Sequence, residues 1–96
     1  MDPVSLIVEH QKDFLKYLKS EFPIYHLSNV FFRDFHYGVM NYLIGYKKRL
    51  RYYDAEAVTR GVIAEFEKQG LLKKVDDKTW LINYVEFRLP RVKKAS

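Results

Sequence analysis

The chain has 96 residues, of which 48% are hydrophobic, 17% aromatic and 30% charged, and its formal net charge is +5. This length and composition predict one packed globular domain over residues 1–96 and exclude a largely disordered chain. The sequence contains no cysteine, which excludes disulfides and thiolate metal sites.

The first predicted element is an amphipathic helix over about residues 3–22, because apolar residues recur there at steps of three and four. Asp2 followed by Pro3 marks its start, since an aspartate can accept the free amides of the first turn and proline fits that turn. Pro23 marks its end. We therefore expect one continuous helix before the proline.

The same segment argues against secretion and membrane insertion. Asp2, Glu9 and Asp13 stand where a secretory signal would carry bases followed by an unbroken apolar stretch. No run approaches the roughly 18 apolar residues of a membrane span. We expect a cytoplasmic protein that does not contact a membrane.

A second helix is predicted over about residues 29–48, with Ser28 or Asn29 as its cap. Its apolar residues cover more than one side, so the helix should be central and contacted by several neighbours. Gly38 and Gly45 lie seven residues apart, close to one line along this helix. Such a line favours a shallow groove where another helix approaches closely.

A third helix is predicted over about residues 55–69, with Asp54 as its cap. Its expected buried stripe consists of Val58, Val62 and Phe66. The helix should stop at Gly70, which can adopt the left-handed conformation.

The segments "LLKKV" and "TWLINY", separated by "DDK", predict a β-hairpin over about residues 71–84. A basic tail over residues 88–96 completes the chain. The predicted class is mainly α with a small C-terminal hairpin, an α+β fold.

A helix, then "EKQGLL", then a charged hairpin with an aromatic strand resembles the end of a winged helix-turn-helix domain, over about residues 54–84. The resemblance implies a winged-helix-like three-helix domain whose third helix faces DNA and whose hairpin is the wing. It implies that Thr59, Arg60 and Lys68 face outward and that the wing carries Lys73, Lys74 and Lys78. The chain departs from the pattern in its long aromatic second helix and in the intervening "RLRYY".

Charge provides a test of this resemblance. From Asp54 to Gly70 the chain carries four carboxylates against two bases, a net of −2, which opposes entry between two phosphate strands. Arg60 stands four residues after Glu56, so an ion pair within the helix is as good an interpretation as a base contact.

The clearest cluster of bases is "KKRLR", which contributes Lys47, Lys48, Arg49 and Arg51 next to Tyr52 and Tyr53. Bases beside aromatics can hold a phosphate backbone and stack a nucleobase. A solvated helix C-terminus explains the same bases slightly better, because its dipole favours positive charge. Lysines on the hairpin can likewise serve to prevent edge-to-edge aggregation.

The aromatic content suggests self-association, since a small domain has limited room to bury so many rings. The residues that we expect at a homodimer interface along the second helix are Phe31, Phe32, Phe35, Tyr42 and Tyr46. The alternative is that most of these rings complete the core.

The sequence offers no catalytic or metal-binding pattern. His10, His26 and His36 are scattered and do not share a helical face at metal-binding spacing. No serine lies in a nucleophile elbow, and no glycine opens a phosphate-binding loop after a strand. We expect a protein that is not an enzyme and binds neither a metal nor a cofactor.

Two functions remain. The first is a small nucleic-acid-binding regulator, with DNA favoured, that uses the basic segment and the wing more than the third helix. The second is a protein-interaction or assembly module that keeps the winged-helix shape. The basic segment favours the first function, and the acidic third helix favours the second.

Overall fold

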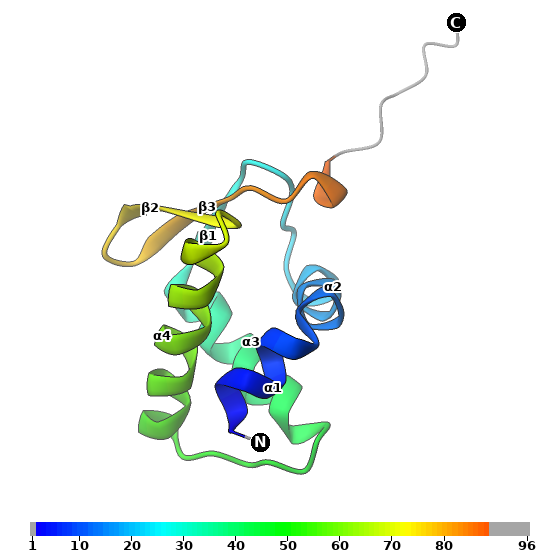
Figure 1. Cartoon of the computed structure of the whole chain (residues 1–96), viewed down its shortest axis with the longest axis vertical. Coiled ribbons are helices and arrows are strands. Elements are labelled where there is room, and N and C mark those ends of the chain that lie inside the picture. The colour runs from blue at the N-terminus through cyan, green and yellow to red at the C-terminus, as the bar shows by residue number, and fades with distance from the viewer. Residues whose placement is uncertain (1, 89–96) are drawn as a thin grey trace, which may run out of the picture.

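The structure is a computed structural model that describes residues 2–88, and it confirms the predicted α+β class (Figure 1). The fold consists of four α-helices and one small three-stranded antiparallel sheet. In chain order the elements are α1 (Pro3–Glu9), α2 (Gln11–Glu21), β1 (Asn29–Phe31), α3 (Phe32–Ile44), α4 (Tyr52–Lys68), β2 (Leu72–Asp76), β3 (Thr79–Ile82) and the 3-10 turn η1 (Val85–Phe87).

The prediction of one helix over residues 3–22 is wrong, because the helix breaks at His10. The start is as predicted: Asp2 Oδ1 accepts a hydrogen bond from the Ser5 amide at 3.1 Å. His10 then leaves helical geometry at φ −110° and ψ 35°. The break lets α1 pack against α4 while α2 packs against α3. Both halves thereby bury their apolar sides, which one straight helix could not do against two differently oriented partners (Figure 1).

The second predicted helix is shorter than expected at both ends. Its first residues form β1, which pairs antiparallel with β3, so that Val30 lies opposite Trp80. Val30 is buried while its two neighbours in the strand are exposed, the alternation of a half-buried strand. At the other end α3 stops at Ile44, because Lys47 turns into the left-handed region at φ 60°. The Lys48 amide then donates to Leu43 O at 2.9 Å and closes the helix end.

The predicted central position of this helix is confirmed. Phe35, Val39 and Leu43 of α3 are all fully buried, and α3 contacts α2, α4 and β1. The ring of Phe14 from α2 lies 6.4 Å from that of Phe35 and 6.3 Å from that of Phe66 in α4. These three phenylalanines join the three helices in one core.

The two glycines of α3 differ in their surroundings. A Cβ at Gly38 would collide with the buried Leu18 side chain of α2, so the close approach of another helix is confirmed there. A Cβ at Gly45 would meet only the carbonyl of Tyr42 in the same helix. The expected helix contact is therefore absent at Gly45 among residues 2–88.

Helix α4 begins at Tyr52, three residues before the predicted start. Arg51 occupies the cap position in an extended conformation without a side-chain cap bond, and Asp54 lies in the first turn, where the helix dipole favours a carboxylate. The predicted end is confirmed. Gly70 has φ +82°, and the Leu71 amide donates to Phe66 O at 2.8 Å, so the chain reverses into β2.

The predicted hairpin is present as β2 and β3, and β3 is the central strand of a sheet in the order β1-β3-β2. Thr79 of β3 pairs with Asp76, with a register shift between Lys74 and Asp76. Of the predicted basic tail only Arg88 is described, and residues 89–96 lie outside the described residues. No helix in residues 2–88 has the length and apolar character needed to cross a membrane.

The packing at Gly38 gives a stability prediction. Gly38→Ala gains up to about 1 kcal/mol of helix propensity, but the added methyl overpacks against Leu18, which costs roughly 1–3 kcal/mol. We expect Gly38→Ala to lower the free energy of unfolding in urea, while the matched variant Gly45→Ala is neutral or slightly stabilising. Equal effects of the two variants would contradict the close approach of α2 to α3.

Candidate functional site

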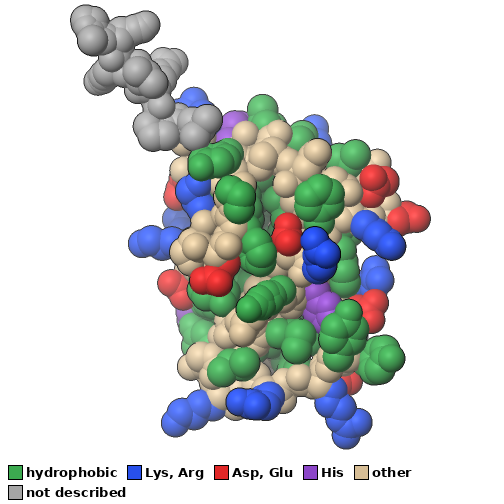
Figure 2. All heavy atoms as spheres, turned by 180° about the vertical axis from the view of Figure 1, so that it is seen from behind, with side chains coloured by type: hydrophobic (Ala, Val, Ile, Leu, Met, Phe, Trp, Pro, Cys, Tyr) green, Lys and Arg blue, Asp and Glu red, His purple; other side chains and the backbone are tan. Residues whose placement is uncertain are grey.

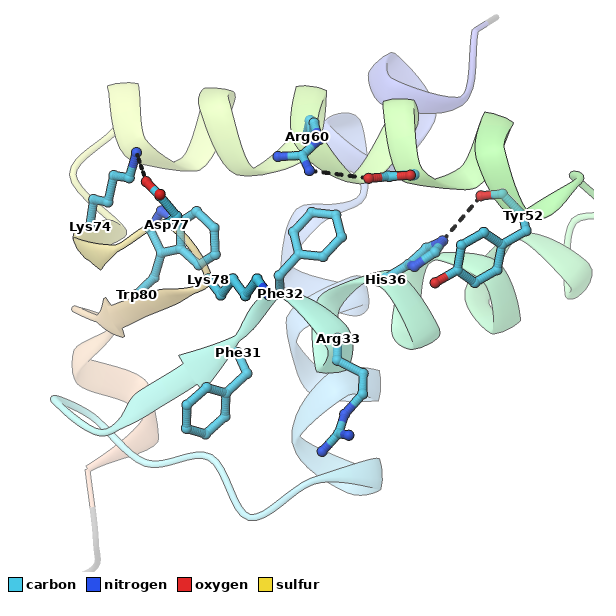
Figure 3. Close-up of a pocket in the computed structure, with 11 residues that line it drawn as sticks. Phe31, Phe32, Arg33, His36, Tyr52, Arg60, Lys74, Asp77, Lys78 and Trp80 are labelled. Atoms are coloured by element: carbon cyan, nitrogen blue, oxygen red, sulfur yellow. Dashed lines mark hydrogen bonds and ion pairs between the residues drawn. The ribbon is translucent and has the colours of Figure 1, made fainter.

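An open groove of about 850 Å³ lies between the first half of α3, the outer side of α4 and the hairpin (Figure 3). Its walls come from three separate parts of the chain. The residues that line it are Phe31, Phe32, Arg33, His36, Tyr52, Glu56, Arg60, Lys74, Asp77, Lys78 and Trp80. The groove therefore combines aromatic rings with four basic and two acidic side chains.

Five rings form a continuous aromatic row, made of Trp80, Phe32, His36 and Tyr52, which line the groove, and Tyr53, which continues the row beyond it. Successive ring centroids lie 6.4, 5.7, 4.5 and 5.8 Å apart. Phe32 and His36 stand four residues apart on α3, so they share one face of that helix. Trp80 extends the row into β3, and the two tyrosines extend it onto the first turn of α4.

The aromatic row is buried at the hairpin end and exposed at the other end. Trp80 is buried, and its Nε1 donates to Glu67 Oε2 at 2.8 Å. His36 is also buried, and its Nε2 lies 3.2 Å from the carbonyl oxygen of Tyr52. A carbonyl only accepts, so that nitrogen carries the hydrogen. Tyr52 and Tyr53, by contrast, are 61% and 79% exposed, and their rings are open to a ligand.

Arg60 covers the middle of the row. Its guanidinium carbon lies 4.7 Å from the centroid of the Phe32 ring, within the range of a cation–π contact. The same group pairs with Glu56 at 3.1 Å, four residues earlier on α4. The ion pair predicted from this spacing is thus confirmed, and Arg60 faces outward, as expected, while reaching into the groove (Figure 3).

The remaining basic side chains lie at the hairpin and at the start of α3. Lys74 Nζ lies 3.5 Å from Asp77 Oδ1. Lys78 extends from the hairpin toward Phe32, and Arg33 points out from the first turn of α3 (Figure 3). Within residues 2–88 neither Arg33 nor Lys78 takes part in an ion pair, so both positive charges are available to an anionic ligand.

The hairpin tip is fixed by a carboxylate. Asp76 Oδ1 accepts a hydrogen bond from the Lys78 amide at 2.9 Å. This bond, with a second one from the Thr79 side chain, holds the pKa of the exposed Asp76 below its ordinary value. The turn therefore sets the position of the Lys78 side chain at the groove edge.

The basic segment predicted to bind nucleic acid lies away from the groove. Lys47, Lys48, Arg49 and Arg51 form the loop between α3 and α4, at the opposite end of α4 from the hairpin (Figure 1). Helix α4 has 17 residues, so it separates this loop from the hairpin by about 25 Å. The structure does not bring these predicted site residues together with the hairpin lysines.

Two further predicted contacts differ from the sequence-based expectation. Thr59 does not face outward: it is fully buried, and its Oγ1 donates to Ala55 O at 2.7 Å. A buried threonine is tolerated here because its hydroxyl is satisfied within its own helix. On β2 the side chains alternate, so Lys74 lines the groove while Lys73 is exposed outside it.

The five residues predicted for a homodimer interface are divided between core and surface. Phe35 and Tyr42 are buried within the chain, as in the alternative that such rings complete the core. Phe32 is half-buried in the groove. Phe31 and Tyr46 remain 49% and 40% exposed, so only these two present a large open ring surface.

Tyr42 also provides a polar link between two helices. Its hydroxyl donates to Asp13 Oδ2 at 2.8 Å and lies 3.3 Å from the Tyr46 hydroxyl. Burial is the main reason that the pKa of Tyr42 is raised. The phenol therefore stays protonated and continues to donate to Asp13.

The sequence analysis missed Arg33, His36 and Trp80 as groove residues, and it considered Tyr52 and Tyr53 only as neighbours of the basic segment. The spacing of Phe32 and His36 was visible in the sequence, but the approach of Trp80 and Tyr52 depends on the fold. Among residues 2–88 no three histidine or acidic side chains gather as a metal site would require. Comparisons with protein-family models, curated proteins and solved structures found no match.

The hairpin tip gives a pH prediction. A lowered carboxyl pKa stabilises the folded turn fully above the ordinary value of 3.8, and this contribution is lost as the pH falls through the lowered pKa. We expect the Lys78 and Thr79 amide signals, followed by NMR, to titrate with a midpoint below 3.8. Asp76→Asn should abolish this transition, whereas Asp77→Asn should leave it in place. A midpoint at or above the ordinary value would contradict the hydrogen-bonded turn.

Proposed function

We propose that this chain is a small nucleic-acid-binding domain of the winged helix-turn-helix kind. The observation that carries the proposal is the groove itself, in which aromatic rings and basic side chains alternate between α3, α4 and the hairpin. Proteins that hold nucleic acids combine these two kinds of side chain, cations for the phosphates and rings for the bases. The order of α4, the turn at Gly70 and the hairpin supports the resemblance to a winged domain.

Phosphate binding would begin at Arg33 and Lys78. Their charges are not compensated by an ion pair within residues 2–88, and both come from the side of the groove that the hairpin and the start of α3 form together (Figure 3). Arg60 and Lys74 share their charge with Glu56 and Asp77 and would contribute less. A backbone that follows the groove could therefore contact these two cations along one side, with Arg60 of α4 on the side across from them.

The acidic character of α4 is compatible with this proposal, because several of its carboxylates already have partners. Glu56 pairs with Arg60, Glu65 lies 3.9 Å from Lys68 Nζ, and Glu67 accepts from Trp80. These contacts reduce the repulsion that α4 would exert on phosphates. They do not make α4 attractive to phosphates, so we assign the main phosphate contacts to α3 and the hairpin.

The loop between α3 and α4 supplies a second basic surface. Figure 2 shows Lys and Arg side chains at the end of the molecule where this loop lies, away from the hairpin. Its four bases could contact the same nucleic acid about 25 Å from the hairpin. The lack of cysteines suits a reducing compartment, and we infer that the protein acts in the cytoplasm.

A second candidate function is protein interaction, including homodimerisation. The observation that favours it is the exposure of Tyr37 and Ile44 on α3, which are 51% and 45% exposed and seven residues apart. Figure 2, which views the molecule from the side opposite Figure 1, shows hydrophobic side chains over the middle of that side. Exposed apolar patches commonly mark interaction surfaces.

The proposed function is tested by two variants that remove equal charge. The groove variant replaces Arg33, Arg60, Lys74 and Lys78 by Ala, and the loop variant replaces Lys47, Lys48, Arg49 and Arg51 by Ala. We expect the wild-type chain to bind labelled DNA with a Kd of roughly 1–100 μM or tighter, measured by fluorescence anisotropy at several salt concentrations. The groove variant should lose roughly tenfold or more in affinity and show a flatter salt dependence.

The loop variant is the matched control for net charge. A smaller loss in this variant indicates that the groove makes the principal contacts. Equal losses would indicate non-specific attraction by net charge and would remove the groove from the proposal. No binding of DNA by the wild-type chain, even at low salt, would contradict the nucleic-acid function. The molar mass from light scattering would then test whether the chain forms a homodimer.

A further inference from the structure

We propose that the groove binds single-stranded nucleic acid, with unpaired bases stacked on Phe31, on the Arg60 guanidinium and on Tyr52. This inference rests on the proposed nucleic-acid function and specifies its substrate class. It is carried by the combination of open stacking surfaces and uncompensated cations in one concave site. Base stacking on such platforms is sequence-tolerant, because every base presents a π face.

The aromatic row supplies the first platform at its exposed end. Tyr52 meets His36 at an interplanar angle of 68° and Tyr53 at 85°, so neither neighbour lies flat against it. With 61% of its surface exposed, Tyr52 keeps ring surface that a base could cover. Its backbone carbonyl is bonded to His36, which holds the first turn of α4 in place beneath that base.

Arg60 supplies the second platform in the middle of the groove. One side of its guanidinium lies over the Phe32 ring at 4.7 Å, and its side chain is 62% exposed. Glu56 holds the group in place through the ion pair at 3.1 Å. An arginine held in this way offers its outer plane to an unpaired base, as guanidinium planes do in RNA recognition.

Phe31 supplies the third platform, at the hairpin side. It is the last residue of β1, 49% exposed, and it pairs with Thr79. The next residue donates its amide to the carbonyl of Lys78 at 2.9 Å. This places a ring and a cation at the same edge, where a base and its phosphate could be bound together.

A duplex fits these features less well than a single strand. Stacking platforms need bases whose faces are open, whereas the bases of a duplex are stacked on each other. A helix that enters the major groove carries side chains that hydrogen-bond base edges. The outer side of α4 instead presents Ala57 and Ala64 between its charged residues, and neither can donate or accept through its side chain.

The test compares labelled single-stranded oligonucleotides of about ten nucleotides with the same sequence as a duplex. The aromatic variant is Phe31→Ala with Tyr52→Ala, and the control is Tyr37→Ala, an aromatic of similar exposure outside the groove. We expect the wild-type chain to bind the single strand more tightly than the duplex. Each lost ring should weaken single-strand binding roughly 5- to 100-fold with an unchanged salt slope, since the phosphate contacts persist.

A second variant, Phe31→Leu with Tyr52→Leu, keeps apolar side chains and removes the rings, so it separates stacking from general packing. Circular dichroism checks that both variants fold. Trp80, the only tryptophan of the chain, provides a second readout, because it lies in the groove wall. We expect binding of the single strand to change the fluorescence of Trp80 in the wild-type chain and in Tyr37→Ala.

The two proposals fail in different ways. Single-strand stacking is overturned if the wild-type chain binds duplex and single strand equally and the aromatic and leucine variants bind as tightly as the wild type. In that case a loss of affinity in the groove variant would still support the proposed nucleic-acid function. If the wild-type chain binds neither form at low salt, both proposals are overturned. If the leucine variant keeps wild-type affinity for the single strand while the alanine variant loses it, stacking is overturned and the contact is a general apolar one.

Discussion

The pairing of β3 with β1 is the constraint on which the rest of the structure depends. It puts Trp80 opposite Val30, just before α3 begins, and the following amide of Phe32 donates to Lys78 O. The hairpin is thereby attached to the start of α3 as well as to the end of α4. Without this second attachment the hairpin would be held mainly against the end of α4, through the Trp80–Glu67 hydrogen bond and the buried side chains of Leu72 and Ile82. The wall that the groove shares with the start of α3 would then not be fixed.

The positions of α3 and α4, the two helices that line the groove, are fixed by core packing between them and by the turns that end them. Phe35 and Phe66 share the ring of Phe14 as a neighbour, which fixes α3 against α4. Both helices end in a left-handed residue with a hydrogen bond back into the last turn, Lys47 in α3 and Gly70 in α4. A lysine in this conformation is disfavoured by roughly 1 kcal/mol relative to glycine, so the turn after α3 is maintained by the packing on either side of it.

The sequence predicted what depends on local pattern. Periodicity found the buried side of α4, and Gly70 and the hairpin followed from local turn chemistry. The sequence analysis did not predict β1, because a three-residue strand is defined by its pairing with a partner some fifty residues away. It missed the break at His10, because the apolar pattern of α1 continues into α2 without interruption. The groove was beyond prediction for the same reason, since Phe32, Tyr52 and Trp80 come from three elements that only the tertiary fold brings together.

The separation of the two basic surfaces explains what each can contribute. The loop between α3 and α4 is rich in cations, but the rings that follow it, Tyr52 and Tyr53, join the aromatic row of the groove instead. Within residues 2–88 the groove has two cations without an ion pair, Arg33 and Lys78, and it combines them with the rings of Phe31, Phe32, Tyr52 and Trp80. Cations alone attract any phosphate backbone, whereas rings beside cations distinguish open bases from paired ones. In the proposed function, discrimination between nucleic-acid forms would therefore belong to the groove, and the loop would add attraction without discrimination.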